Sequence, residues 1–128
     1  MRGAMLGTAL AMAAGAAVAA QSVQIDGDQA TVEMPVLHLR GLDTLNGTAR
    51  DIDMRVGEAV RFGHLEIVAE ACRVPRGDEA GDAYAFLQIR DVRETAPRFS
   101  GWMFASSPAL SALDHPRYDV WVVSCSNS

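Results

Sequence analysis

The chain has 128 residues, 49% of them hydrophobic, and a net charge of −5. Nucleic acids and anionic lipid surfaces are bound through clustered positive charge, which a chain with 11 basic and 16 acidic residues lacks. We therefore expect no nucleic-acid partner. The length fits a single domain, and a domain of this size buries only a thin core.

Residues 1–20 have the features of a signal peptide. Arg2 supplies a short positive start, an uncharged run rich in alanine and glycine follows, and small residues precede the polar Gln21. We place the cleavage after Ala20, with Ala19 as the second choice. Since alanine and glycine partition weakly into hydrocarbon, we expect this run to be cleaved and not kept as a membrane anchor. We therefore expect a periplasmic protein with no membrane span after cleavage.

The rest of the chain predicts short strands. Residues 21–34 are polar and predict a flexible N-terminal segment. We expect residues 35–126 to form a single β-domain, with residues 127–128 as its tail. Period-two alternation and turn residues such as Asn46-Gly47 define the strands. We expect strands at 36–40, 48–54, 59–62, 65–72, 84–90, 99–105 and 118–125.

This spacing predicts an all-β fold, an antiparallel β-sandwich or a small barrel of about six or seven strands. Residues 84–90 are apolar on both faces, which is typical of a central strand. The only helical signal begins at Ser107-Pro108, where the serine hydroxyl can cap the helix and proline suits its first position. The predicted helix ends near His115 after about two turns.

Cys72 and Cys125 are the only cysteines. An exported chain meets an oxidising compartment, so we expect one structural disulfide between them. Alternation places Leu65, Ile67 and Ala69 on one face and Cys72 on the other. Either a bulge after Ala69 turns Cys72 inward, which is our first choice, or the disulfide lies near a sheet edge.

The C-terminal third is rich in aromatic and polar side chains. We expect most of its large rings to fill the core, but alternation prevents all of them from facing one interior. An exposed surplus would form a partner-binding patch. The candidate binding surface comprises Trp102, Phe104, Ser107, His115, Arg117, Tyr118 and Trp121.

A hydrolase would use Ser106 or Ser107 as nucleophile, His115 as base and Asp114 or Asp119 as the orienting carboxylate. The chain has no Gly-x-Ser-x-Gly elbow, so we assign no catalytic residue.

Metal binding is the other chemical alternative. His38, His64, His115 and the cysteines lack the close spacing of metal ligands, so we expect no metal and no cofactor.

The segment from Gly101 to Trp121 has the pattern GWMxASSPxLxxLxHPxYDVW, and Leu-Arg-Gly-Leu-Asp at 39–43 and Ala-Cys-Arg at 71–73 precede it. With these motifs the chain resembles, from about residue 39 to 125, a small family of exported proteins of unknown function from alphaproteobacteria. The resemblance implies an exported, disulfide-bridged domain and brings no activity.

These observations favour a non-enzymatic periplasmic domain that binds another envelope protein or an inner-membrane protein complex. The alternatives are an envelope hydrolase using Ser107 and His115, and a small-molecule carrier.

Overall fold

The computed structural model describes Gly7 and residues 30–128 of the chain. The predicted signal peptide, apart from Gly7, and residues 21–29 of the predicted flexible segment lie outside the described residues. The strands are β1 (Thr31–Glu33), β2 (Val36–Asp43), β3 (Thr48–Arg55), β4 (Ala59–Phe62), β5 (Leu65–Pro75), β6 (Tyr84–Asp91), β7 (Phe99–Phe104) and β8 (Tyr118–Ser126).

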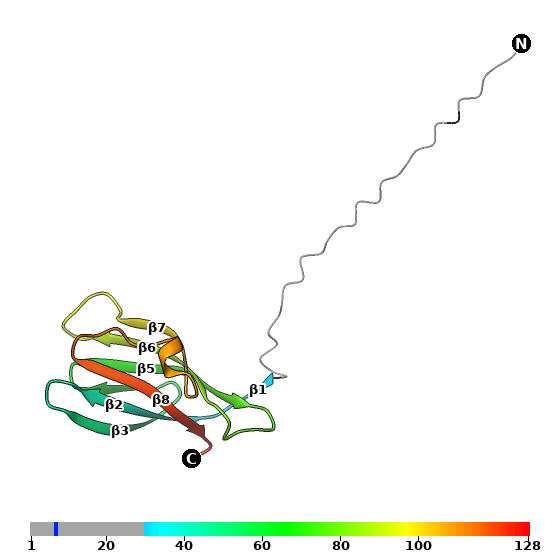
Figure 1. Cartoon of the computed structure of the whole chain (residues 1–128), viewed down its shortest axis with the longest axis horizontal. Helices are drawn as coiled ribbons and strands as arrows, with labels where there is room; N and C mark the ends of the chain where they lie inside the picture. Colours follow the sequence, from blue (N-terminus) through cyan, green and yellow to red (C-terminus); the bar gives the residue numbers. More distant parts are fainter. Residues whose placement is uncertain (1–6, 8–29) are drawn as a thin grey trace, which may run out of the picture.

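The strands form two antiparallel sheets that pack as a sandwich (Figure 1). Sheet A has the order β1-β5-β6-β7, and β4 also pairs with β5. Sheet B has the order β3-β2-β8. The expected all-β fold is confirmed, and the central strand predicted at 84–90 is β6, which lies between β5 and β7.

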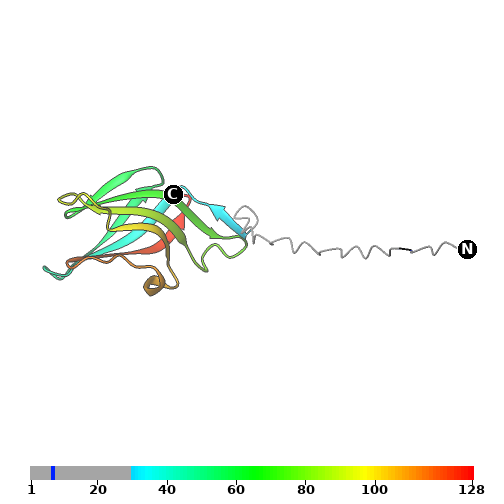
Figure 2. The ribbon, with the colours of Figure 1, turned by 90° about the horizontal axis from the view of Figure 1, so that it is seen from above.

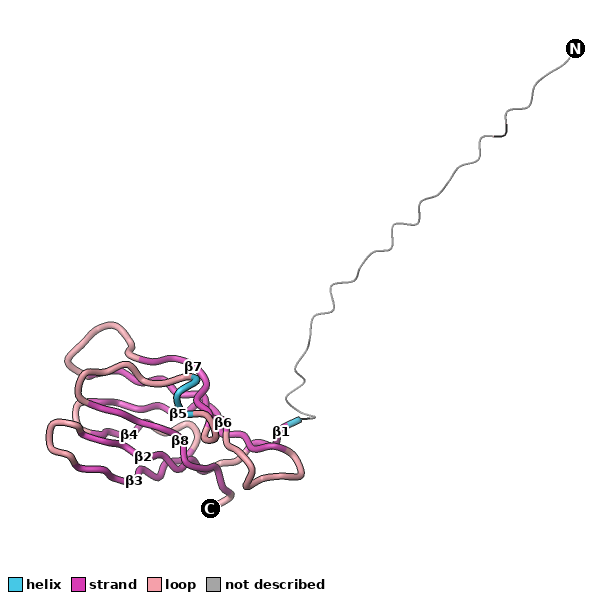
Figure 3. The backbone as a smooth tube through the Cα atoms, viewed as in Figure 1, coloured by secondary structure: helices cyan, strands magenta, loops and turns pink. Residues whose placement is uncertain are grey.

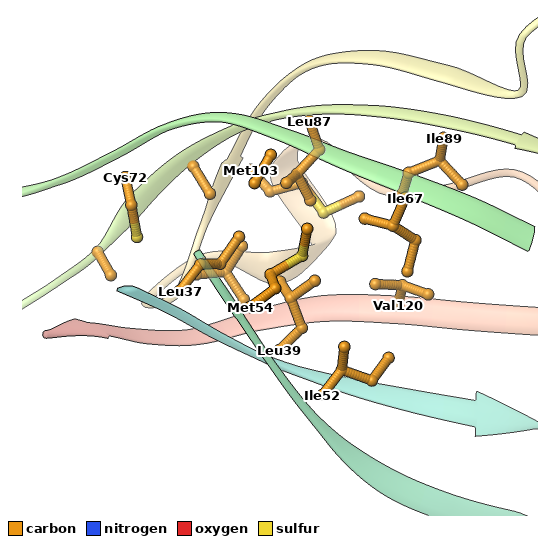
Figure 4. Close-up of a cluster of buried hydrophobic side chains, with 14 of the residues drawn as sticks. Leu37, Leu39, Ile52, Met54, Ile67, Cys72, Leu87, Ile89, Met103 and Val120 are labelled. Carbon is orange, nitrogen blue, oxygen red and sulfur yellow. The ribbon is translucent and has the colours of Figure 1, made fainter. Parts of the chain in front are cut away.

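The core lies between the two sheets and is built by alternation. On β2, Leu37 and Leu39 point inward, and so do their register partners Met54 and Ile52 on β3 and, from β8, Val120. Figure 4 shows these side chains facing Ile67, Leu87, Ile89 and Met103 from sheet A. Because successive strand residues face opposite sides of the sheet, the residues between these positions form the two outer faces.

Two β-bulges bring the cysteines into this core. On β5, the register shifts between Ala69 and Ala71, so Glu70 is the extra residue. On β8, Leu39 pairs with Val122 and His38 with Ser124, so Val123 is the extra residue. Each bulge lies two residues before a cysteine and reverses the alternation.

Cys72 is therefore buried, and it forms a disulfide with Cys125 across the two sheets, with their Cα atoms 5.9 Å apart. The predicted disulfide is confirmed, and so is the bulge after Ala69. The bond joins β5 of sheet A to β8 of sheet B.

Residues 31–34 do not belong to a flexible segment as expected. Residues 31–33 form β1, whose register pairs Val32 with Val74 on β5. The Met34 amide donates to the Cys72 carbonyl at 2.8 Å, and the Met34 side chain is buried. Figure 2 shows β1 and the end of β5 extending beyond the rest of the sandwich.

The two-turn helix that the sequence predicts after Ser107 does not form. Only a 3₁₀ turn forms, η1 (Pro108–Leu110), beside the end of β7 (Figure 3). The Ser107 side chain makes no capping hydrogen bond, and no residue of η1 is buried, so packing adds nothing to a weak helical propensity. Within residues 30–128, the structure has no helix long and apolar enough to cross a membrane.

Candidate binding surface

Four aromatic side chains gather on the outer face of sheet A, at the pairing of β6 with β7. We call this group the aromatic patch; it comprises Tyr84, Phe86, Trp102 and Phe104. The register pairs Tyr84 with Phe104 and Phe86 with Trp102. Their ring centroids lie 5.8 Å and 5.4 Å apart, and both pairs are edge-to-face. Cross-strand aromatic pairs of this kind stabilise a sheet.

The patch faces outward because the alternate residues of both strands fill the core. Ala85 and Leu87 on β6 and Met103 on β7 are buried. Trp102 remains 37% exposed, and the other three rings are half-buried. The expectation that most large rings of the C-terminal third fill the core is wrong. Met103 takes the inward position on β7, so Trp102 and Phe104 on either side of it face outward, and Trp121 on β8 faces outward as well.

The structure does not bring the predicted surface residues together. Trp102 and Phe104 lie on the outer face of sheet A. Trp121 pairs with Arg40 on β2 and faces outward from sheet B, since Val120 and Val122 on either side of it are buried. Tyr118 is buried at the start of β8, and Ser107 is exposed beside η1. The two tryptophans thus occupy opposite faces of the sandwich.

His115 lies inside the molecule, where it is held by Asp91. Its side chain and that of Asp91 are each 2% exposed, and His115 Nε2 lies 3.0 Å from Asp91 Oδ2. The amides of Arg117 and Tyr118 donate to His115 Nδ1 at 3.0 and 3.2 Å. Because Nδ1 accepts these bonds, the proton belongs on Nε2, which donates it to Asp91.

Asp91 is the centre of this polar network. Arg93 binds it through both Nε and Nη2, at 2.9 and 2.7 Å, and through its backbone amide. The Arg93 guanidinium, with a further contribution from His115, holds the pKa of Asp91 well below its usual range. Asp91 is therefore a permanent anion at neutral pH and anchors the segment that contains His115.

A second pair closes the same end of the sandwich. Arg117 donates from Nε and Nη2 to the two carboxylate oxygens of Asp43, at 3.0 and 2.9 Å, and its guanidinium lies over the Tyr118 ring. The hydrogen bonds from Arg117 lower the pKa of Asp43. Arg117 thus joins the start of β8 to the end of β2 and acts as a structural contact.

This geometry gives no support to the hydrolase arrangement. The orienting carboxylate of His115 is Asp91, whereas Asp114 and Asp119 are exposed. Both ring nitrogens of His115 already have partners within the protein, so neither is available to take a proton from a serine. Ser106 donates its hydroxyl proton to Asp82 at 2.6 Å.

One cluster offers three ligand atoms of the kinds that bind metals. Asp91, Glu94 and His115 each place one such atom within 4.8 Å of the others. Arg98 binds both oxygens of Glu94, at 2.7 and 2.8 Å, as Arg93 binds those of Asp91. A cation would have to displace two guanidinium groups, so the cluster is built as an ion-pair network.

A cleft of about 290 Å³ opens at the polar end of the sandwich. Arg50, Phe62 and Tyr118 are among its lining residues, and the Arg50 guanidinium lies over the Phe62 ring at 5.3 Å. Its volume lies at the lower limit of small-molecule sites. The cleft gives little support to a carrier.

Sequence reasoning missed Asp91, Tyr84 and Phe86. Alternation from Tyr84 to Ile89 does contain the signal for the two rings, because Ala85 and Leu87 occupy the other face. Asp91 lies 24 residues before His115 and follows no recognisable motif. Only the tertiary fold brings that carboxylate to the histidine.

Comparisons with known proteins give one family and one relative. Residues 37–125 match the sequence model of a family described as an uncharacterized protein conserved in bacteria, DUF2155. An uncharacterized protein of Rickettsia prowazekii (strain Madrid E) is 28% identical over 87 residues, which is 66% of this chain. The chain spans 56% of the length of that relative. No solved structure matches the chain.

Proposed function

Because the chain belongs to the DUF2155 family of uncharacterized bacterial proteins, which brings no known activity, we propose a function from the chain's own surface. The proposed function is that of a non-enzymatic binding domain, exported to the periplasm, which docks on another envelope protein through the aromatic patch. The exposed Trp102 beside Phe86 is the observation that carries this proposal.

The patch has the composition of a binding hot spot. Tryptophan and tyrosine dominate the energetics of protein interfaces, and rings already packed against each other lose little freedom when a partner binds. Phe86 and Trp102 are fixed by cross-strand packing, and Tyr84 and Phe104 extend the same surface along β6 and β7. A rigid aromatic platform on a small domain suits the capture of an apolar side chain.

Two further features support the proposal. The Cys72–Cys125 disulfide suits an oxidising compartment such as the periplasm. The buried His115–Asp91 pair is fully bonded within the protein, and this role accounts for the histidine without catalysis.

Site-specific crosslinking in intact cells tests the docking face. A photoreactive amino acid is placed at position 102 in one strain and at position 121 in another, because Trp121 is a matched tryptophan on the opposite face. We expect one envelope protein to be captured repeatedly from position 102 and not from position 121. The captured protein is then purified and its affinity measured by calorimetry.

The purified pair gives the decisive measurement. Truncating a hot-spot tryptophan costs about 2 kcal/mol or more, so Trp102→Ala should weaken the complex about thirty-fold. Trp121→Ala should leave the affinity within about two-fold, as expected of a residue outside the interface. Equal crosslinking from both positions, or an unchanged affinity for Trp102→Ala, would refute the proposal.

A further inference from the structure

An arginine on β3 faces the inner side of sheet B without a carboxylate partner. Ile52 and Met54 on this strand point into the core, and the register of β3 with β2 is regular, so Arg50 faces the same side by alternation. Within residues 30–128, no acidic side chain pairs with Arg50. Its guanidinium lies over the Phe62 ring and lines the cleft at the polar end of the sandwich.

Phe62 gives this cleft an apolar lining. It is the last residue of β4, which lies near β2 at this end (Figure 3), and its side chain is buried. Gly41 on β2 makes room for the ring, since a Cβ at that position would lie 2.8 Å from Phe62 Cζ. The cleft therefore combines an aromatic surface with a cation that the protein leaves unpaired.

Tyr118 presents a second hydrogen-bond donor to the same cleft. The residue is 2% exposed, and its hydroxyl oxygen accepts the His64 amide at 3.2 Å. In the part of the chain that the structure describes, the hydroxyl proton has no acceptor. Gly63 leaves the hydroxyl uncovered, because a Cβ there would lie 2.5 Å from its oxygen. Since buried polar groups are almost always hydrogen-bonded, this proton requires an acceptor from outside the chain.

The acidic residue of the cleft does not neutralise Arg50. Asp43 lines the cleft, but Arg117 binds both of its carboxylate oxygens, at 3.0 and 2.9 Å. The charge of Asp43 is therefore already balanced, and Arg50 remains as a single positive charge. Thr48 faces the same side of β3 as Arg50 and adds a hydroxyl to the lining.

We propose that this cleft binds a carboxylate, with the Arg50 guanidinium on its oxygens and the Tyr118 hydroxyl donating to one of them. A guanidinium suits the two oxygens of a carboxylate, and one cation matches its single charge better than the higher charge of a phosphate. Phe62 and Ala49 offer apolar contact to a short group behind the carboxylate. A small free acid and the C-terminus of a peptide both present this group.

The carboxylate site goes beyond the proposed function. It lies beside β3 and β4, whereas the aromatic patch is on the outer face of β6 and β7, so either can fail without the other. An inward charge on an edge strand such as β3 also discourages pairing with another strand. Edge protection needs only the charge of Arg50, and it does not account for the unpaired proton of Tyr118 in the same cleft.

NMR titration of the purified, oxidised protein tests the site. The probes are butyrate, acetyl-dialanine with a free carboxylate, the same dipeptide with a C-terminal amide, and inorganic phosphate. The backbone amides of Ala49, Gly63 and His64 report on the cleft. Ligands with so few atoms bind weakly, so we expect dissociation constants in the millimolar range for the two carboxylates.

Arg50→Gln removes the cation, and Arg55→Gln is the matched control. Arg55 is another exposed arginine of β3, but alternation places it on the outer face of sheet B. Five residues of strand separate the two positions by about 16 Å, which exceeds the Debye length of about 8 Å at physiological salt. We expect Arg50→Gln to weaken carboxylate binding by about tenfold or more, as the loss of a charged hydrogen bond does. Arg55→Gln should leave the dissociation constant within about two-fold.

The two carboxylate probes distinguish the sources of the ligand. Tighter binding of the dipeptide acid supports a chain terminus, and tighter binding of butyrate supports a free acid. The proposal is overturned if neither carboxylate shifts the cleft amides at high millimolar concentration, if the dipeptide amide binds as tightly as the acid, or if phosphate binds more tightly than both carboxylates. Equal dissociation constants for Arg50→Gln and Arg55→Gln would also overturn it.

Discussion

The disulfide between the two sheets ties distant parts of the chain together and should contribute strongly to stability. Cys72 and Cys125 are 53 residues apart in sequence, and the bond closes the loop that contains β6, β7 and η1. On the chain-entropy account, closing a loop of this length stabilises the folded state by about 4 kcal/mol. The double variant Cys72→Ala with Cys125→Ala should lose about this amount.

Equilibrium unfolding in urea measures that loss. Tryptophan fluorescence follows the transition, because Trp102 and Trp121 report on one sheet each. For a domain of this size, a loss of 4 kcal/mol lowers the melting temperature by roughly 15 to 30 °C. The natural chain in a thiol reductant is the matched control, since it breaks the same bond without changing the side-chain packing of Cys72 and Cys125.

Two results would refute this reasoning. One is a free energy of unfolding that falls by less than about 1 kcal/mol in both the double variant and the reduced chain. This would mean that the unfolded chain gains little freedom when the loop opens. The other is a large difference between the double variant and the reduced chain, which would assign the loss to packing around the sulfurs.

Two other changes to the sequence, one deletion and one substitution, test the local geometry. Deleting Glu70 removes the bulge and should turn Cys72 to the outer face, so the protein unfolded without reductant should expose two reactive thiols, whereas the natural chain exposes none; a retained disulfide would contradict the role of the bulge. Asp91→Asn should destabilise the fold at pH 7, because Arg93 and His115 lower the pKa of Asp91. A lowered pKa contributes stability that is present above the ordinary carboxyl value of about 3.9 and is lost as the pH falls below it, so the variant should lose less stability than the natural chain between neutral and acid pH. Asp51→Asn, at an exposed pair with Arg40, is the control, and equal pH profiles for the natural chain and Asp91→Asn would contradict the assignment.

Much of the fold could be predicted because strands are encoded locally. The alternation of Leu37 and Leu39 with His38 and Arg40 predicts a half-buried strand, and β2 has that pattern. Cys72 follows Ala69 by three residues, and this break in the alternation is enough to predict a bulge. β1 was missed because three residues carry too little alternation to distinguish a strand from a flexible segment.

The candidate site was predicted only in part, since it depends on which face of each strand meets the other sheet. Trp102 and Trp121 both lie in apolar predicted strands, yet the fold places them on opposite faces of the sandwich. In the sequence His115 is a possible base beside Asp114, but in the structure its partner is Asp91 at the end of β6.

The sequence by itself determined the all-β class, the pairing of the two cysteines and most strand positions. These follow from side-chain periodicity, turn chemistry and a cysteine count of two, which are properties of short segments. Only the tertiary structure decided which aromatic rings stay outside and which carboxylate holds His115. Those features arise from contacts between residues far apart in the chain, where burial and strand order determine the partners.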